Sequence, residues 1–300
     1  MTEITAEMVR NLRERTGVGM MECKKALLAA NGVVDDAIEA LRKAGQASAV
    51  KKGSRIAAEG LIAAVAAADQ KLALIAEINC ETDFVAREDR FKKFAVDVAQ
   101  CALQSNVQDV TALSEQTLSN GKSLDAVRLE LVAQIGENIA VRRFKSVRAA
   151  GNGVVAVYLH GGGTAARIGS IVALDIADAN LAKDIAMHIA AMRPEYLSES
   201  EVPAERLAKE KEIFMAQTSE ANAGKPADIV EKIIAGRLSK FLKEITLLGQ
   251  PFVKNPDQTV GALLSAAKAK VTDFVRYEVG EGIEKKTTDF VSEVMAQVKG

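Results

Sequence analysis

The feature that most constrains the fold is a pattern that occurs twice along this 300-residue chain. In each copy, two apolar runs are separated by a short turn and are followed by a segment whose apolar residues have helical spacing. The first copy covers residues 59–68, 71–79 and about 89–103, and the second covers 153–160, 167–176 and a helix through 185–190. Each copy predicts a β-hairpin followed by a helix. We therefore expect an α+β protein with a duplicated core built on antiparallel sheets.

The two copies differ in the connection between the hairpin and the helix. Pairing Lys71 with Arg167 in the strands gives an offset of 96, whereas pairing Ala95 with Ala186 in the helices gives 91. The first copy therefore carries about five extra residues at this point. A duplicated scaffold with one extended loop suggests that the loop has a task of its own, because loops on rigid scaffolds often carry function.

The remaining segments predict mainly helices. Thr5 is a plausible N-cap for a first helix, residues 21–30 predict a second, and Asp35-Asp36 open a third that Gly45 closes. The small, basic segment 47–52 resembles a linker. In the first copy a helix at 123–135 and a strand at 139–147 follow.

The second copy is interrupted by two long helical patterns. Residues 204–221 and 227–244 fit an antiparallel helical hairpin that projects as an arm. A helix at about 260–270, a strand at 273–279 and a helix at 288–298 complete the chain. The expected domains are a helical unit at 1–54, core subdomains at 55–148 and 149–280 with the hairpin inserted at about 200–245, and a C-terminal helical module at 281–300.

The extended loop contains the tetrapeptide Thr82-Asp83-Phe84-Val85, which recurs at 272–275 and at 288–291. In the later copies the phenylalanine is expected in the core, because those copies begin a strand and a helix. Only the first copy lies in a loop. It presents a carboxylate beside an aromatic ring, without a histidine or a reactive cysteine–histidine pair nearby. These residue types do not support covalent catalysis, but they suit a contact with a partner protein.

Motifs of common enzymes are incomplete in this chain. His160 precedes three glycines, as in an esterase oxyanion hole, but no Gly-x-Ser-x-Gly nucleophile motif exists. The glycines at 151–153 open a strand rather than a helix, and Gly121-Lys122-Ser123 lacks the upstream glycine of a phosphate loop. The other histidine, His188, lies on an apolar helix and is expected to be structural. An enzyme is therefore improbable.

The net charge and the cysteines limit which kinds of partner and which cellular compartment we expect. A net charge of −1 argues against nucleic acid as the main partner, since phosphate binding requires a positive surface. Cys23, Cys80 and Cys101 are far apart without metal-ligand spacing, which indicates free thiols and no metal site. No apolar run is long enough to cross a bilayer and no signal peptide is visible. We expect a cytoplasmic protein that binds no membrane.

Six motifs together resemble bacterial elongation factor Ts, in the family's order from end to end. They are residues 12–27 (LRERTGVGMMECKKAL), 77–86 (EINCETDFVA), 136–139 (GENI), 187–190 (MHIA), 248–252 (LGQPF) and 278–284 (EVGEGIE). The resemblance implies a guanine nucleotide exchange factor for elongation factor Tu. It also implies a ubiquitin-associated-like helical N-terminal domain, a core of two subdomains, an inserted coiled-coil hairpin and a C-terminal helical module. The turn at 161–164 is longer than the family pattern.

In the mechanism that the resemblance implies, Phe84 wedges into the GTPase with Asp83 beside it, and the loop of Thr82 to Val85 disturbs the magnesium site. GDP and Mg²⁺ are bound by the partner, so this chain needs no cofactor. Met20, Met21 and His160 are further expected contacts. One alternative is a helical adaptor that binds without releasing nucleotide, and another is an enzyme that turns over a small substrate.

Overall fold

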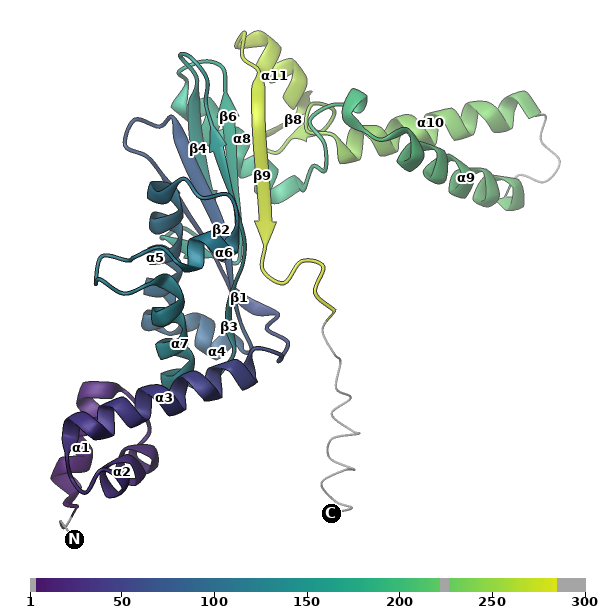
Figure 1. Ribbon diagram of the computed structural model, residues 1–300. Coiled ribbons are helices and arrows are strands. Elements are labelled where there is room, and N and C mark those ends of the chain that lie inside the picture. Colours follow the sequence, from purple (N-terminus) through teal and green to yellow (C-terminus); the bar gives the residue numbers. More distant parts are fainter. Residues whose placement is uncertain (1–3, 222–226, 285–300) are drawn as a thin grey trace.

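The computed structural model describes residues 4–221 and 227–284, in which helices cover two larger antiparallel sheets, beside a third sheet of two short strands (Figure 1). The four-stranded sheet has the order β3-β2-β1-β5, and the three-stranded sheet has the order β4-β6-β9. The strands are β1 (Glu59–Ala66), β2 (Leu72–Cys80), β3 (Ile139–Arg148), β4 (Val154–Leu159), β5 (Ala165–Ala166), β6 (Ile168–Leu174) and β9 (Val271–Glu278). Both predicted hairpins, β1–β2 and β4–β6, are confirmed, as is the α+β class.

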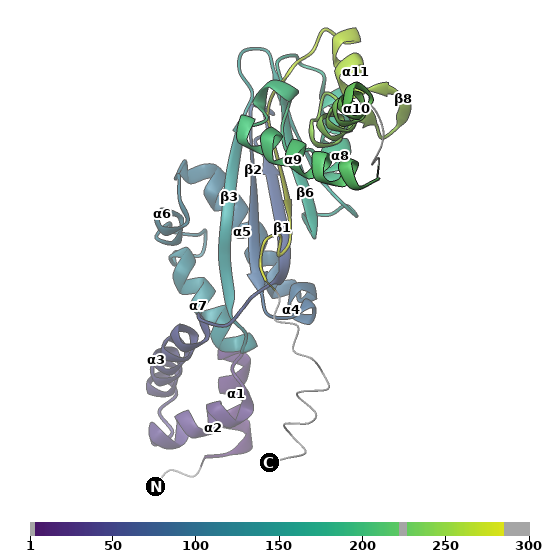
Figure 2. The same ribbon diagram turned by 90° about the vertical axis from the view of Figure 1, so that its right-hand side faces the viewer.

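The two sheets pack face to face, with helices on both outer surfaces (Figure 2). Along β1, Leu61 and Ala63 point into a core shared with the helices, whereas Ile62 and Ala64 point into a core shared with the second sheet. This alternation follows from the two-residue repeat of a strand. Alanine-rich strands are weak strand formers by propensity, but burial on both faces stabilises them here.

The outer helices complete the two cores. Helices α5 (Asp89–Ser105), α6 (Val110–Ser114) and α7 (Leu124–Ile135) cover the four-stranded sheet. Helices α8 (Ala179–Met192) and α11 (Val260–Ala266) cover the three-stranded sheet. The helix predicted at 260–270 thus ends earlier, and the short elements α6, β7 (Pro251–Phe252) and β8 (Asn255–Thr259) were not predicted.

The N-terminal unit consists of α1 (Ala6–Thr16), α2 (Met20–Ala29) and α3 (Val34–Lys52), around Leu12 and Leu27. Thr5 caps α1, as predicted. The prediction that Gly45 ends the third helix is wrong, because α3 continues through it to Lys52. Gly45 lies against α7: a β-carbon at this position would be 2.8 Å from that of Ala133. The expected linker at 47–52 is therefore helix.

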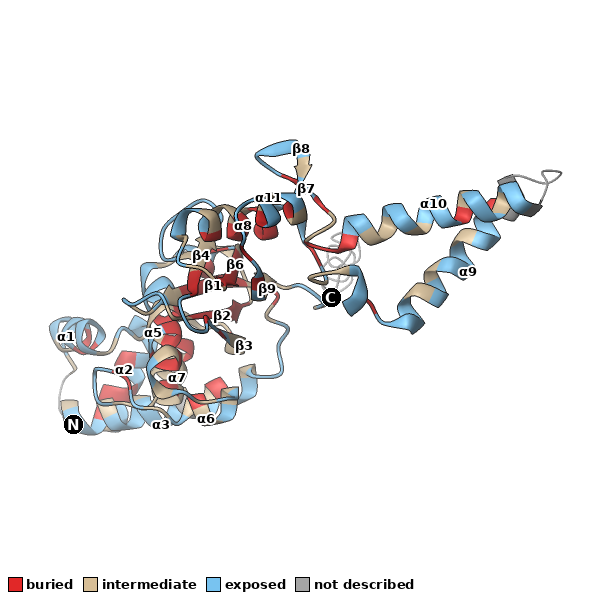
Figure 3. Ribbon diagram, turned by 90° about the horizontal axis from the view of Figure 1, so that it is seen from above, coloured by how far each residue is buried: buried red, intermediate tan, exposed pale blue. Residues whose placement is uncertain are grey.

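The predicted arm is confirmed as α9 (Ala204–Ala221) and α10 (Ala227–Ile245), which project from the core with mostly exposed surfaces (Figure 3). Phe214 and Phe241 pack edge to face between the two helices, with ring centroids 6.2 Å apart. The helix expected at 288–298 and the third tetrapeptide at 288–291 lie outside the described residues.

Candidate functional site

The candidate site is a short helix, not the loop that the sequence predicted. Helix α4 (Asp83–Arg87) follows β2, and Thr82 is its N-cap, with its hydroxyl accepting a hydrogen bond from the backbone N–H of Val85. Residues 81–88 connect β2 to α5, whereas residues 175–178 connect β6 to α8. The connection in the first copy is thus four residues longer, and most of it is the helix α4.

Helix α4 has one buried face and one exposed face. Val85 and Ala86 are buried in the core under the four-stranded sheet. In the free chain the Val85 side chain thus anchors the helix, and its predicted contact with a partner stays a prediction. Phe84 points the other way and is 76% exposed, the largest exposed fraction among the described large hydrophobic side chains. An exposed aromatic ring on an anchored helix is a surface suited to a partner.

Asp83 shares the exposed face with Phe84, and it has an intramolecular partner. Its carboxylate accepts a hydrogen bond from the Arg87 guanidinium one turn later, at 2.6 Å. Both side chains are substantially exposed, so the pair contributes little to the stability of the free protein. The negative charge beside Phe84 is thus partly balanced before any partner binds.

Glu137 fixes the start of α4 from a distant part of the chain. Its carboxylate accepts hydrogen bonds from the backbone N–H groups of Glu81 (3.1 Å) and Thr82 (3.0 Å) and from the Thr82 hydroxyl (2.6 Å). Hydrogen bonds to an ionised acceptor are stronger than neutral ones. In the sequence, Glu137 stands out only as part of the motif at 136–139. The local signal is the glycine before it, Gly136, which ends α7 in the left-handed conformation.

A reciprocal set of hydrogen bonds ties this start of α4 to the end of α3. The Glu81 carboxylate accepts the backbone N–H of Asn138 at 2.6 Å. The Asn138 side-chain amide donates to the backbone carbonyl of Arg55 at 2.8 Å. Helix α4, the α7–β3 turn and the end of the N-terminal unit therefore meet at one hydrogen-bonded junction, which holds α4 in place.

The other predicted contact residues lie on separate elements. Met20 and Met21 are exposed at the start of α2 in the N-terminal unit. His160 is exposed in the turn after β4, with its Nδ1 atom 3.4 Å from the Tyr158 hydroxyl. The structure thus leaves all three side chains accessible, on elements other than α4.

The second histidine is structural, as predicted. His188 is fully buried, and its Nδ1 accepts the backbone N–H of Val253, so Nε2 carries the proton and donates to Gln250 at 2.9 Å. Burial lowers the pKa of His188, which keeps the ring neutral. It therefore has no access to a substrate.

Neither the cysteines nor the potential metal-binding side chains form a reactive centre within the described residues. All three cysteines are free and buried. Burial raises the pKa of Cys80 to about 12, so its thiol stays protonated. Among residues 4–221 and 227–284, no group of three potential ligands could hold a metal, and no helix is long and apolar enough to span a bilayer.

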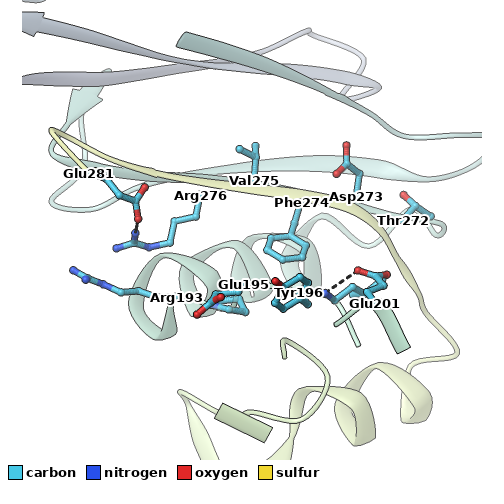
Figure 4. Close-up of a pocket in the computed structure, with 12 residues that line it drawn as sticks. Arg193, Glu195, Tyr196, Glu201, Thr272, Asp273, Phe274, Val275, Arg276 and Glu281 are labelled. Carbon is cyan, nitrogen blue, oxygen red and sulfur yellow. Dashed lines mark hydrogen bonds and ion pairs between the residues drawn. The ribbon is translucent and has the colours of Figure 1, made fainter. Parts of the chain in front are cut away.

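A cavity of about 700 Å³ lies between β9 and the segment after α8 (Figure 4). Both arginines that line it are paired: Arg193 and Arg276 contact Glu278, and Arg276 also contacts Glu281. Phe274, from the second tetrapeptide, lines this cavity and is half-buried against the core around α8. It was expected in the core and lies at its margin. This cavity offers no nucleophile with an adjacent base.

Comparison with known proteins agrees with the motifs. The family model described as "Elongation factor TS" matches residues 81–281. The chain is 56% identical over 297 residues to "Elongation factor Ts" of Thioalkalivibrio sulfidiphilus, covering 99% of both chains. It is 57% identical over 296 residues to "Elongation factor Ts" of Methylococcus capsulatus, again covering 99% of both. It is 52% identical over 299 residues to that of Legionella pneumophila, covering 100% of both.

Proposed function

The chain belongs to the elongation factor Ts family, a family of translation elongation factors that exchange guanine nucleotide on elongation factor Tu, and we propose that α4 is its exchange element. The observation that carries this proposal is the exposure of Phe84 on a helix whose opposite face is buried. Aromatic anchors that fill a partner's pocket dominate many interfaces. The hydrogen bonds that the carboxylates of Glu137 and Glu81 accept keep the helix in place, so little ordering is needed on binding.

The proposed mechanism requires no covalent step. A GTPase holds its nucleotide through a phosphate loop and a Mg²⁺ ion that bridges phosphate oxygens. Mg²⁺ demands near-ideal octahedral geometry, so a small displacement of its ligands weakens its binding. Insertion of Phe84 beside that site would favour the nucleotide-free GTPase. By linkage, the nucleotide affinity then falls by the same factor by which nucleotide weakens binding of this chain.

Further contacts would add affinity away from the nucleotide. We propose that the N-terminal unit binds the GTPase domain through Met20 and Met21, and that the second sheet binds another domain of the partner near His160. Support comes from the exposure of these side chains. The division into units at 1–54, 55–148, 149–280 and 281–300 is part of this proposal. The first boundary falls just after the end of α3.

Stopped-flow measurement of fluorescent GDP release from purified elongation factor Tu tests the proposed function. We expect the release rate to rise with the concentration of this chain and then to saturate, because the chain acts through a complex. A helical adaptor would bind elongation factor Tu without changing the release rate, and calorimetry on the same samples would detect that binding. If the chain neither binds elongation factor Tu nor accelerates GDP release, both binding functions are excluded and an enzyme remains as the alternative.

A further inference from the structure

Helices α1 and α2 are joined to the core by one side-chain hydrogen bond within the described residues. The amide Nε2 of Gln134, on α7, donates to the backbone carbonyl of Thr16 at 2.9 Å. Thr16 is the last residue of α1, and the carbonyls of a last helical turn have no partner within the helix. Gln134 therefore supplies a donor from the core where α1 needs one.

The surroundings of Gln134 are shaped for this contact. Gly17, which ends α1, has a φ of 67°, and a β-carbon there would lie 3.2 Å from the Cδ atom of Gln134. The glycine thus allows both the left-handed turn and the close approach. On the other side, Arg90 of α5 donates to Oε1 of Gln134 at 3.3 Å. Gln134 joins α1 to α7 and α5, and α5 begins directly after α4.

Helices α1 and α2 pack on α3 through the core around Leu12 and Leu27, and α3 in turn packs on α7. A cleft of about 850 Å³ separates α1 and α3 from α7 next to this contact, with Val18, Ile38 and Leu129 among its lining residues. Helix α3 is fixed on the core at Gly45, which lies against Ala133 of α7, and at the buried Ala49. Between α1 and α7 themselves, the Gln134 hydrogen bond therefore crosses a cleft rather than a packed interface.

We propose that Gln134 is a positioning residue that holds α1 and α2, with Met20 and Met21, at a fixed orientation relative to α4. The N-terminal unit would then bind the partner as part of one rigid surface with Phe84, rather than as a module on a flexible tether. Rigid presentation reduces the entropy that binding costs, since the second contact is already in place. This functional consequence rests on the proposed exchange function; the orientation itself does not.

The test is a spin-label distance measurement on the full chain, with labels at the exposed positions Leu28→Cys on α2 and Gln104→Cys on α5. The native cysteines are buried and leave the labelling specific. Gln134→Glu removes the donor and keeps an acceptor for Arg90, whereas Gln134→Lys restores a donor for Thr16. We expect a narrow distance distribution for the parent and for Gln134→Lys, and a broad one for Gln134→Glu. A narrow distribution in all three would overturn the proposal.

The same variants are then compared in GDP release at sub-saturating concentration. Because one hydrogen bond is lost, we expect Gln134→Glu to accelerate GDP release about fivefold less than the parent. Gln134→Lys should accelerate release as the parent does. A broadened distribution with undiminished GDP release would show that the orientation does not serve exchange, and would overturn that half of the proposal. If the parent chain itself failed to accelerate release, the proposed function would fail, while the distances would still report on Gln134.

Discussion

Phe84→Ala is expected to slow GDP release from elongation factor Tu by about 30-fold or more at equal concentration, since truncating a buried aromatic anchor at an interface costs about 2 kcal/mol or more. The melting temperature of the free protein should stay nearly unchanged, because the ring is 76% exposed and contributes little to the core. The measurement pairs stopped-flow GDP release with thermal unfolding of the same sample.

Two matched variants control for the loss of structure and of charge. Phe91→Ala removes a fully buried ring two residues into α5 and should cost about 3–5 kcal/mol of unfolding free energy, with normal exchange per folded molecule. Asp83→Ala should slow release only moderately, because a solvent-exposed interface charge contributes less than an aromatic anchor. If Phe84→Ala loses as much stability as Phe91→Ala while exchange per folded molecule stays normal, α4 has only a structural role and is not the exchange element.

Glu77→Gln is expected to destabilise the protein by about 2–3 kcal/mol near neutral pH, because it leaves two arginines without their buried counter-charge. Glu77 is fully buried on β2 and accepts hydrogen bonds from Arg142 (2.9 Å), Arg143 (2.7 Å) and the backbone N–H of Gly280 (2.8 Å). The two guanidinium groups remain about a quarter to a third exposed, so water offsets part of the loss.

The same carboxylate makes stability depend on acid pH. Burial alone would raise the pKa of Glu77, but the hydrogen bonds from Gly280, Arg142 and Arg143 outweigh it and lower the pKa below its usual value. A lowered folded-state pKa contributes stability above the unfolded pKa of about 4.3 and loses it as pH falls through the folded-state pKa.

Denaturant unfolding of the parent and of Glu77→Gln at neutral and at acid pH measures this contribution. The difference in unfolding free energy between the two proteins should be largest at neutral pH. It should shrink as the pH falls below the usual range of a carboxyl group, because the parent then loses what the variant already lacks. A difference that stays constant down to strongly acid pH would contradict the assignment of a lowered pKa to Glu77.

Local patterns in the sequence were sufficient for most of the elements. The hairpins follow from two apolar runs around short turns, and the arm from two helical repeats around residues 222–226. Gly45 misled the prediction because glycine usually marks a helix end. In this protein its missing side chain admits Ala133 of α7, a contact between residues far apart in the sequence.

The site was predictable only in part for the same reason. The position of Phe84 followed from the extra residues between strand and helix. The roles of its neighbours depend on residues that are far away in the sequence. Glu137 accepts hydrogen bonds from residues 81 and 82 at the start of the helix, and Val85 packs into the core under the four-stranded sheet. The tetrapeptide alone does not show which of its side chains will be buried in the core and which will be exposed to a partner.

The most direct test of the account is the dependence of GDP release on Mg²⁺, because α4 is proposed to act through the magnesium site of the partner. Release from elongation factor Tu is measured with and without saturating amounts of this chain, first with Mg²⁺ in excess and then with a chelator. We expect the acceleration factor to be smaller in chelator by roughly tenfold or more, the size of a typical coupling between two sites. An acceleration factor that is the same with Mg²⁺ and with chelator would contradict it.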